Sequence, residues 1–329
     1  MISKHVREDW YTQLDNLATS DDLNHLSDTF KSVESNHNTP VLTANFCMAN
    51  PDFTKIKESN FKQFYFETFS STLRQVHGEG VEDTWKKIIK NKVVKPQLHG
   101  REHLHALAWM KELRKGNSEL REAFDLNSWG IPYIAQGKQR RKNCQAALDH
   151  YGIDGEINFQ RTWISESAEL FRKHFGFDSS TFIAPTYVWH PDINSTIAES
   201  GIQAYQGIQF QDIPLSAGSR LYKRKLNILG SRTQEGIWFL VRNAFFEPSS
   251  NPGYDWKNHC LDGIFKAFKY NMPAIIGSHR VNYIGSLNEQ NRERNLKQLK
   301  EILQTVVRKY PDVRFMSSDE LLSTMLSKK

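Results

Sequence analysis

The strongest constraint on this chain is the alternation of short apolar runs with longer segments of helical periodicity. The apolar runs are bounded by turn-forming residues and predict buried strands at residues 41–46, 93–98, 181–184, 203–208, 237–241, 274–277 and 313–316. The intervening segments predict helices at residues 21–33, 61–76, 103–114, 166–175, 256–270 and 291–309. Strands that alternate with helices pair in parallel, so we expect either an open doubly wound sheet or a closed α/β barrel.

The lack of a nucleotide-binding motif favours the barrel. Neither G-x-G-x-x-G nor G-x-x-x-x-G-K-[ST] follows any predicted strand. The sequence has no internal repeat and no low-complexity linker, and its 329 residues suit one α/β barrel, which commonly takes about 250 residues or more. We therefore predict a single domain over residues 1–329.

The charge balance does not indicate a nucleic-acid partner. Lys and Arg total 43 against 37 Asp and Glu, a formal net charge of +6. We interpret basic runs such as residues 139–142 and 223–225 as solvated faces. The three cysteines contain no C-x-x-C pair, which indicates a reducing compartment. With no long apolar stretch and no secretory signal, the sequence predicts a cytoplasmic protein without a membrane span, and it leaves the oligomeric state open.

The densest group of reactive residues follows the predicted strand 93–98, where His99, His103 and His105 lie close to Glu102 in the sequence. The spacing of His99 and His103 brings both imidazoles to one side of a helical first turn, where they can share a divalent zinc, cobalt, nickel or iron ion. Such a site needs a further protein ligand, commonly a carboxylate. The alternative is a set of hydrogen-bonded histidines at a polar edge. His105 is expected at the surface.

The same residues also match H-x-x-E-H, a zinc-peptidase pattern in which both histidines lie on one helix. Against this alternative, His99 directly follows an apolar run that contains Pro96, and Gly100 comes next, which favours a strand end over a helix interior. A peptidase would also need a downstream glutamate ligand, for which Glu166 and Glu169 are only nominal candidates. The peptidase is therefore the weaker interpretation.

Two further strand ends carry polar or aromatic residues. His279 and Arg280 follow the run 274–277, and because an ordinary imidazole titrates near neutral pH, His279 is predicted to protonate a leaving group. Aromatic residues after the run 181–184 form a surface on which a carbohydrate ring can stack, although a Tyr/Trp pair in a loop more often packs within the protein than contacts a ligand. The residues predicted to orient a substrate are Arg101, Asn45, Arg280, Tyr187 and Trp189.

These strand ends together resemble the polysaccharide deacetylase superfamily, also known as the NodB-homology or carbohydrate esterase family 4 superfamily. Residues 99–103 are similar to its H-[ST]-x-x-H metal motif, with Gly100 in place of Ser or Thr. Residues 278–283 are similar to its last motif, which contains a general-acid histidine. Residues 184–187 stand where the superfamily has R-x-P-[YF], with Ala184 in place of the arginine. The resemblance extends over residues 10–322 and implies a distorted (β/α)7 barrel.

The resemblance also implies an activity: metal-dependent removal of acetyl groups from an N- or O-acetylated sugar of a bacterial polysaccharide or its precursor. His99 and His103 would hold the ion, with zinc the first choice, and His279 would be the general acid. The superfamily's first strand ends in paired aspartates, one a metal ligand and one the general base, and this chain lacks a matching strand. We therefore expect an N-terminally incomplete barrel. The residues considered as substitute ligands are Asp9, Asp15, Asp21, Asp22 and Asp52.

A binding function is the alternative to catalysis. Without the paired aspartates, a catalytically degenerate relative could still hold a glycan through aromatic and arginine contacts. The two hypotheses differ in whether a carboxylate lies within reach of His99 and His103 in the folded chain, because metal–oxygen bonds are about 2.0–2.2 Å long.

Overall fold

The computed structural model describes residues 10–134, 141–215 and 221–327. The described chain divides into two compact units, and each is treated by itself. The first unit comprises residues 45–72 and 97–240, and the second comprises residues 10–44, 73–96 and 241–327. The division falls inside strands β1, β4 and β11, so segments distant in sequence make up each unit. The predicted single domain over residues 1–329 stays a prediction.

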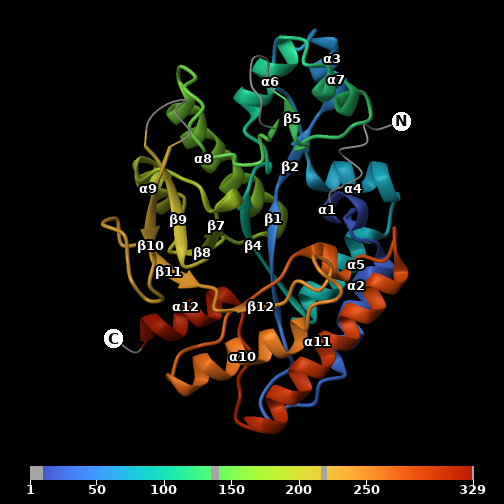
Figure 1. Cartoon of the computed structure of the whole chain (residues 1–329), viewed down its shortest axis with the longest axis vertical. Helices are drawn as coiled ribbons and strands as arrows, with labels where there is room; N and C mark the ends of the chain where they lie inside the picture. The colour runs from blue at the N-terminus through green and yellow to red at the C-terminus, as the bar shows by residue number, and fades with distance from the viewer. Residues whose placement is uncertain (1–9, 135–140, 216–220, 328–329) are drawn as a thin grey trace. The chain divides into compact units, whose positions relative to one another are not determined.

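The fold is mixed α/β, and its central sheet has the strand order β1-β4-β7-β8-β11 (Figure 1). Its strands are β1 (Leu42–Cys47), β4 (Val94–Gly100), β7 (Thr181–Ile183), β8 (Ala204–Gly207) and β11 (Trp238–Val241). The β4–β7 and β7–β8 pairs are parallel, with Leu98 opposite Phe182 and Phe182 opposite Tyr205. The apolar runs therefore predicted these strands correctly, because strands buried on both faces are apolar along their length.

The remaining strands form two-stranded pairs, β2 with β3, β5 with β6, β9 with β10, and β12 with β13. The β12–β13 pair is parallel, and the other three pairs are antiparallel. Their bounds are β2 (Ala49–Pro51), β3 (Phe66–Thr68), β5 (Tyr133–Ile134), β6 (Arg141–Lys142), β9 (Phe210–Pro214), β10 (Tyr222–Leu226), β12 (Ala244–Phe245) and β13 (Ile276–Gly277).

Helices connect most of these strands. The α-helices are α1 (Trp10–Leu14), α2 (Ser20–Lys31), α3 (Phe53–Glu58), α4 (Phe69–His77), α5 (Val81–Lys90), α6 (Ala106–Arg114), α7 (Ser118–Asp125), α8 (Glu156–Phe175), α9 (Asn194–Glu199), α10 (Trp256–Lys269), α11 (Glu289–Lys309) and α12 (Ser318–Ser327). Three short 3-10 helices are η1 (Pro185–Tyr187), η2 (Pro191–Ile193) and η3 (Arg280–Tyr283). Among the described residues, no helix has the length and apolar character that crossing a membrane requires.

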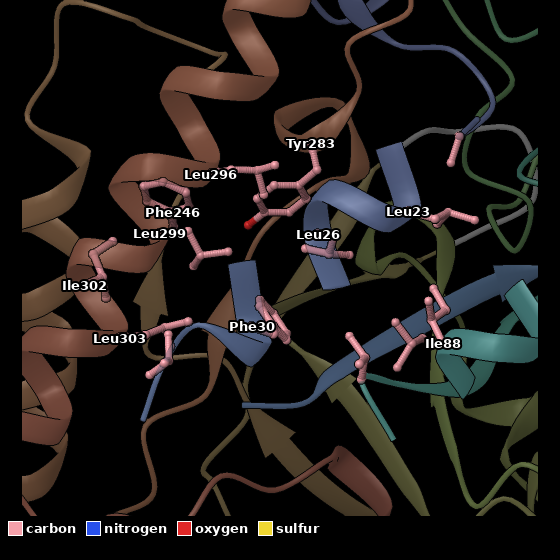
Figure 2. Close-up of a cluster of buried hydrophobic side chains, with 14 of the residues drawn as sticks. Leu23, Leu26, Phe30, Ile88, Phe246, Tyr283, Leu296, Leu299, Ile302 and Leu303 are labelled. Carbon is pink, nitrogen blue, oxygen red and sulfur yellow. The ribbon is translucent and has the colours of Figure 1, made fainter. Parts of the chain in front are cut away.

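The second unit has a core built around α2, α5, α10 and α11. In the view of Figure 2, Leu26 and Phe30 of α2 lie between Leu299 and Leu303 of α11 and Ile88 of α5. Helix α2 begins at a capping box, in which Thr19 and Asp22 satisfy each other's backbone N–H groups. This cap fixes the start of the helix, and the apolar spacing of α2 then directs its leucines into the core.

The first unit contains a buried polar network that crosses its strands. The Gln97 Oε1 atom accepts hydrogen bonds from the Thr181 backbone N–H, at 2.9 Å, and from the Thr181 and Ser179 hydroxyls. The Gln206 amide then donates to Thr181 Oγ1 and to Asn45 Oδ1, at 2.9 and 2.8 Å. Buried amides are tolerated when they are hydrogen-bonded in this way, so the network ties β1, β4, β7 and β8 together.

The helix predicted at 166–175 begins ten residues earlier, at Glu156. Two further predicted elements differ from the structure in kind over several residues. Residues 313–316 form no strand, although their side chains alternate, because the segment has no ladder partner among the described residues. The helix predicted at 61–76 begins only at Phe69, since residues 66–68 form strand β3 opposite β2. In both places tertiary pairing decided the structure, which local periodicity does not report.

Candidate functional site

His99 and His103 lie together in the first unit. His99 is the next-to-last residue of β4, and its Nδ1 donates to the Ile183 carbonyl at 2.7 Å. The ring centroids of His99 and His103 are 4.9 Å apart, with an interplanar angle of 76°. The carbonyl fixes the hydrogen on Nδ1, so Nε2 is the nitrogen of His99 that can act as an acceptor or ligand.

A complete metal site does not form around this pair in the described part of the chain. No group of three or more His, Cys, Asp or Glu side chains there is arranged to hold a metal ion. Asp52 caps α3 by accepting the Lys55 backbone N–H, and Asp21 and Asp22 both accept from Arg292. Asp9 lies outside the described residues. The metal-ligand roles of His99 and His103 stay predictions, and no step is derived from a metal.

Arg101 and Glu102 form a buried ion pair directly after β4. The Arg101 Nε and Nη2 atoms donate to the two carboxylate oxygens of Glu102, at 2.6 and 2.8 Å. Nη1 donates to Glu166, and the guanidinium lies over the Phe66 ring, 4.5 Å from its centroid. Burial raises the pKa of Glu102 against the opposing effect of Arg101. The predicted role of Arg101 in orienting a substrate stays a prediction.

The structure contradicts the H-x-x-E-H interpretation. That pattern requires one helix, whereas His99 lies on a strand and Glu102 is fully buried against Arg101. Gly100 ends the strand in a backbone conformation that an α-helix does not contain. Its φ is +112°, and a Cβ at this position would lie 1.9 Å from the Trp163 ring, so only glycine fits between the strand end and α8.

His105 is not at the surface, contrary to expectation. Its side chain is completely buried and caps α6, with Nδ1 accepting the Ala108 backbone N–H at 3.2 Å. Nε2 faces the Glu156 Oε1 atom at 3.0 Å. Burial acts to raise the pKa of Glu156, but hydrogen bonds from His105 and the Tyr151 backbone hold it below its ordinary value. His105 therefore supports the helix start, which the sequence pattern did not indicate.

The other predicted substrate-orienting residues of the first unit are placed as follows. Asn45 belongs to the buried amide network with Gln206. Trp189 is buried and stacks on Tyr205, with ring centroids 4.7 Å apart. Tyr187 is half-buried and has a left-handed backbone conformation, with φ of +60°. Their roles in substrate binding stay predictions.

A carboxylate–imidazole dyad lies in the second unit. The Nδ1 atom of His279 is 2.6 Å from Glu247 Oε1, and the other oxygen, Oε2, accepts from the Asn282 amide at 2.8 Å. Glu247 is mostly buried, whereas 52% of the His279 side chain is exposed. Because Nδ1 donates to the carboxylate, Nε2 is the ring nitrogen that can exchange a proton with a substrate.

The parallel pair β12–β13 brings these two residues together. Phe245 lies opposite Gly277, and the Phe246 N–H donates to the Gly277 carbonyl. Glu247 and His279 each come two residues after this paired step, so both side chains emerge at the same carboxyl edge. Sequence analysis found His279 but did not single out Glu247. The apolar residues 244–246 directly before Glu247 were the signal that could have found it.

Helix α1 supplies a further neighbour of His279. The Tyr11 ring lies edge-on to the imidazole, with centroids 5.9 Å apart, and Trp10 packs on Tyr11 at 5.3 Å. The Arg280 Nε and Nη2 atoms donate to Asp15, at 3.0 and 2.6 Å. The predicted substrate-orienting role of Arg280 stays a prediction.

Comparisons with known proteins give few matches. No family model matches the chain, and no curated protein matches it. Similar solved structures include the alpha-amylase AmyC from Thermotoga maritima, with a TM-score of 0.43 and 8% identity over 92% of this chain and 68% of that chain. A GH57 branching enzyme from Thermococcus kodakaraensis has a TM-score of 0.40 and 9% identity, over 92% of this chain and 56% of that chain.

These comparisons contradict the expected membership in the polysaccharide deacetylase superfamily. The similar structures are named as an alpha-amylase and a branching enzyme, and no deacetylase model matches. The predicted metal-dependent removal of acetyl groups through an amide or ester bond is therefore wrong. The NodB type of the barrel is not supported either, and no metal site is seen among the described residues that would support zinc binding. The resemblance rested on short motifs, and such motifs recur without the structural context that would confirm them.

Proposed function

We propose that the chain is an enzyme that cleaves or transfers at a glycosidic bond, with His279 as its general acid and base. The observation that supports this proposal is the 2.6 Å contact between His279 Nδ1 and Glu247 Oε1. A carboxylate at Nδ1 sets the tautomer and orientation of an imidazole, and it stabilises the imidazolium that forms during proton transfer. In the proposed reaction, His279 protonates the leaving oxygen and then takes a proton from the attacking water or hydroxyl.

The orientation of Glu247 supports a catalytic role over simple packing. Asn282 holds the second carboxylate oxygen, and Asn282 is itself completely buried. Glu247 therefore has little freedom to rotate, while more than half of the imidazole side chain is exposed. A rigid partner behind a reactive and accessible group is the arrangement that general acid–base catalysis needs.

The aromatic residues beside His279 support a carbohydrate as the substrate. Tyr11 and Trp10 are half-exposed; Tyr11 lies edge-on to the imidazole, and Trp10 packs on Tyr11. Aromatic side chains offer an apolar face together with a polar edge, which suits a ring with C–H faces and hydroxyl edges. We also propose that the strands of the central sheet belong to a distorted (β/α)7 barrel, consistent with the parallel pairing of β4, β7 and β8.

The test is release of reducing ends from amylose, cellulose oligosaccharides and chitin oligosaccharides by the full chain. His279→Asn should lower kcat by about 10²- to 10⁴-fold on any active substrate, with little change in KM. His259→Asn is the matched control, because His259 is exposed in the same unit and contacts Tyr254 and Trp256 instead. It should keep full activity.

Each part of the proposal can fail separately. If no glycan of the panel is cleaved or transferred, the carbohydrate substrate is rejected. If a glycan is processed equally well by wild type and by a folded His279→Asn variant, the catalytic role of His279 is rejected. Thermal unfolding of each variant establishes that a loss of activity does not come from a loss of structure.

A further inference from the structure

Helix α1 of the second unit is too short to hold its own position. It has 5 residues, and the non-helical residues 15–19 follow it. The Asp15 N–H donates to the Tyr11 carbonyl at 2.8 Å and closes its last turn. An isolated helix shorter than about 12 residues is only marginally stable in water, so contacts with the rest of the unit must hold α1 in place.

Arg280 makes a bidentate contact with the residue that follows α1. Its Nε atom donates to Asp15 Oδ1 at 3.0 Å, and its Nη2 atom donates to Asp15 Oδ2 at 2.6 Å. The Asp15 side chain is 14% exposed, and the Arg280 side chain is 48% exposed. An exposed ion pair usually contributes little to stability, but a planar guanidinium that meets both oxygens of a mostly buried carboxylate also fixes the orientation of its partner. The pair therefore attaches α1 to η3.

Further contacts anchor the segment between α1 and α2. The Asn16 amide donates to Ser286 Oγ at 3.4 Å, and His77 Nε2 lies 3.0 Å from the Leu17 carbonyl oxygen. Ala18 is buried in the core of the unit. Because these contacts act beyond the end of the helix, they fix the point from which α1 extends, whereas the ion pair at its last turn fixes the orientation of the helix.

The contacts of Arg280 and His279 with α1 are coupled by their positions in both segments. His279 directly precedes η3, and Arg280 is the first residue of η3. On α1, Tyr11 meets the imidazole at an interplanar angle of 86°, and Asp15 meets the guanidinium. Tyr11 and Asp15 are four positions apart and linked by the hydrogen bond that closes the turn, so they lie on the same side of α1. A movement of α1 that breaks the ion pair would also move the Tyr11 ring away from His279.

We propose that Arg280 is a positioning residue, which acts through Asp15 to hold α1 so that Tyr11 stays against His279. The effect on catalysis rests on the proposed function, in which the aromatic residues of α1 contact the sugar; the effect on structure does not. Glu247 sets the tautomer of His279 from the segment after β12, separately from α1. Loss of the ion pair should therefore weaken glycan binding without slowing proton transfer by His279.

The structural test measures the NMR shifts of the carbon-bound imidazole protons of His279 in the full chain. An aromatic ring beside these protons shifts their resonances, so Tyr11→Leu defines the change that follows when the ring is removed. Arg280→Gln and Asp15→Asn should each move the His279 resonances in the same direction as Tyr11→Leu does. Arg280→Lys should move them less than Arg280→Gln, because it keeps the charge but loses the bidentate geometry.

The kinetic test applies to any glycan that the chain processes. Arg280→Gln should raise KM by about fivefold and change kcat by less than about twofold. Arg308→Gln is the matched control, because Arg308 is an exposed arginine of α11 that contacts Thr305. It should leave KM, kcat and the His279 resonances at their wild-type values.

The outcomes separate this inference from the proposed function. If no glycan is processed, the proposed function fails, and the NMR comparison alone decides the role of Arg280. The inference is overturned if Tyr11→Leu moves the His279 resonances but folded Arg280→Gln does not, or if Tyr11→Leu itself moves nothing. A lower kcat at unchanged KM would also overturn it, because Arg280 would then act in the chemical step. Asp15→Asn breaks the same pair and replaces Arg280→Gln if thermal unfolding shows that the latter does not fold.

Discussion

Glu247 and His279 each lie two residues beyond the last paired residues of two neighbouring parallel strands, and the carboxylate Oε1 lies 2.6 Å from the imidazole Nδ1. The residues are 32 positions apart in the sequence. The strand pair β12–β13 holds them, and Asn282 locks the second carboxylate oxygen. This arrangement determines which nitrogen of His279 is available to a substrate.

Removal of the Glu247 charge should disturb the tautomer of His279. In wild type the Nδ1–H form is favoured because only this form donates to the carboxylate. Glu247→Gln should raise the population of the Nε2–H form, as measured from the nitrogen-15 shifts of the imidazole, and should lower kcat by about tenfold or more. Gln13→Glu, an exposed change on α1, serves as a control. An unchanged tautomer ratio in Glu247→Gln would show that the carboxylate does not orient the ring.

Gly100 should tolerate no side chain. Gly100→Ala places a Cβ 1.9 Å from the Trp163 ring at a φ of +112°, so the variant should lose about 3 kcal/mol or more of unfolding free energy, through overpacking and backbone strain. Gly201→Ala is the matched control: its φ is +84°, but no atom lies within 4 Å of the added Cβ. It should lose only about 1 kcal/mol. Equal losses in urea unfolding would contradict the steric explanation.

Asp22 should make the stability of the chain sensitive to acid. Burial acts to raise the pKa of Asp22, but hydrogen bonds from the Thr19 and Gly285 backbone and from Arg292 hold it below its ordinary value. Its stabilising contribution is therefore present above about pH 4 and is lost as the pH falls through the lower, folded value.

Asp22→Asn should remove that pH dependence. The variant leaves Arg292, which is 3% exposed, with one buried charge partner fewer, and should lose about 3 kcal/mol near neutral pH. Between about pH 6 and pH 3 it should lose less stability than wild type does, because the titrating group is gone. If the unfolding free energies of the two proteins fell by the same amount over this pH range, Asp22 would not be the group responsible for the acid sensitivity.

Gln97 should be necessary for the packing of β4 against β7. Gln97→Met keeps the length of the side chain but leaves the Thr181 N–H and hydroxyl without their acceptor, whereas the Ser179 hydroxyl can still donate to the Thr181 carbonyl. A loss of about 2–4 kcal/mol in unfolding free energy is expected, because buried donors without partners are costly. Gln234→Met, at an exposed position, should change stability by no more than about 0.5 kcal/mol. A neutral Gln97→Met would mean that the network contributes no net stability.

The sequence alone predicted much of the secondary structure. The strands of the central sheet and the helices α2, α10 and α11 follow from apolar runs, helical periodicity and N-caps. It also predicted that His99 ends a strand, since Pro96 and Gly100 disfavour a helix there. These features are local, because residues a few positions apart determine them.

The family resemblance failed for a physical reason. Spacing within residues 99–103 brought two imidazoles together, with ring centroids 4.9 Å apart, but a metal site depends on ligands from distant segments that spacing does not report. Arg101 is a second example. It is buried against Glu166 and Phe66, which are distant in sequence, so the residues next to Arg101 could not predict its burial.

The sequence by itself determined the elements and the candidate histidines, because backbone propensity and apolar periodicity act over a few residues. Only the tertiary structure decided which side chains meet. Parallel pairing of β12 with β13 joined Glu247 to His279, burial turned His105 into a helix cap, and the Trp163 ring made Gly100 indispensable. Contacts between distant segments depend on register and packing, which no local pattern encodes.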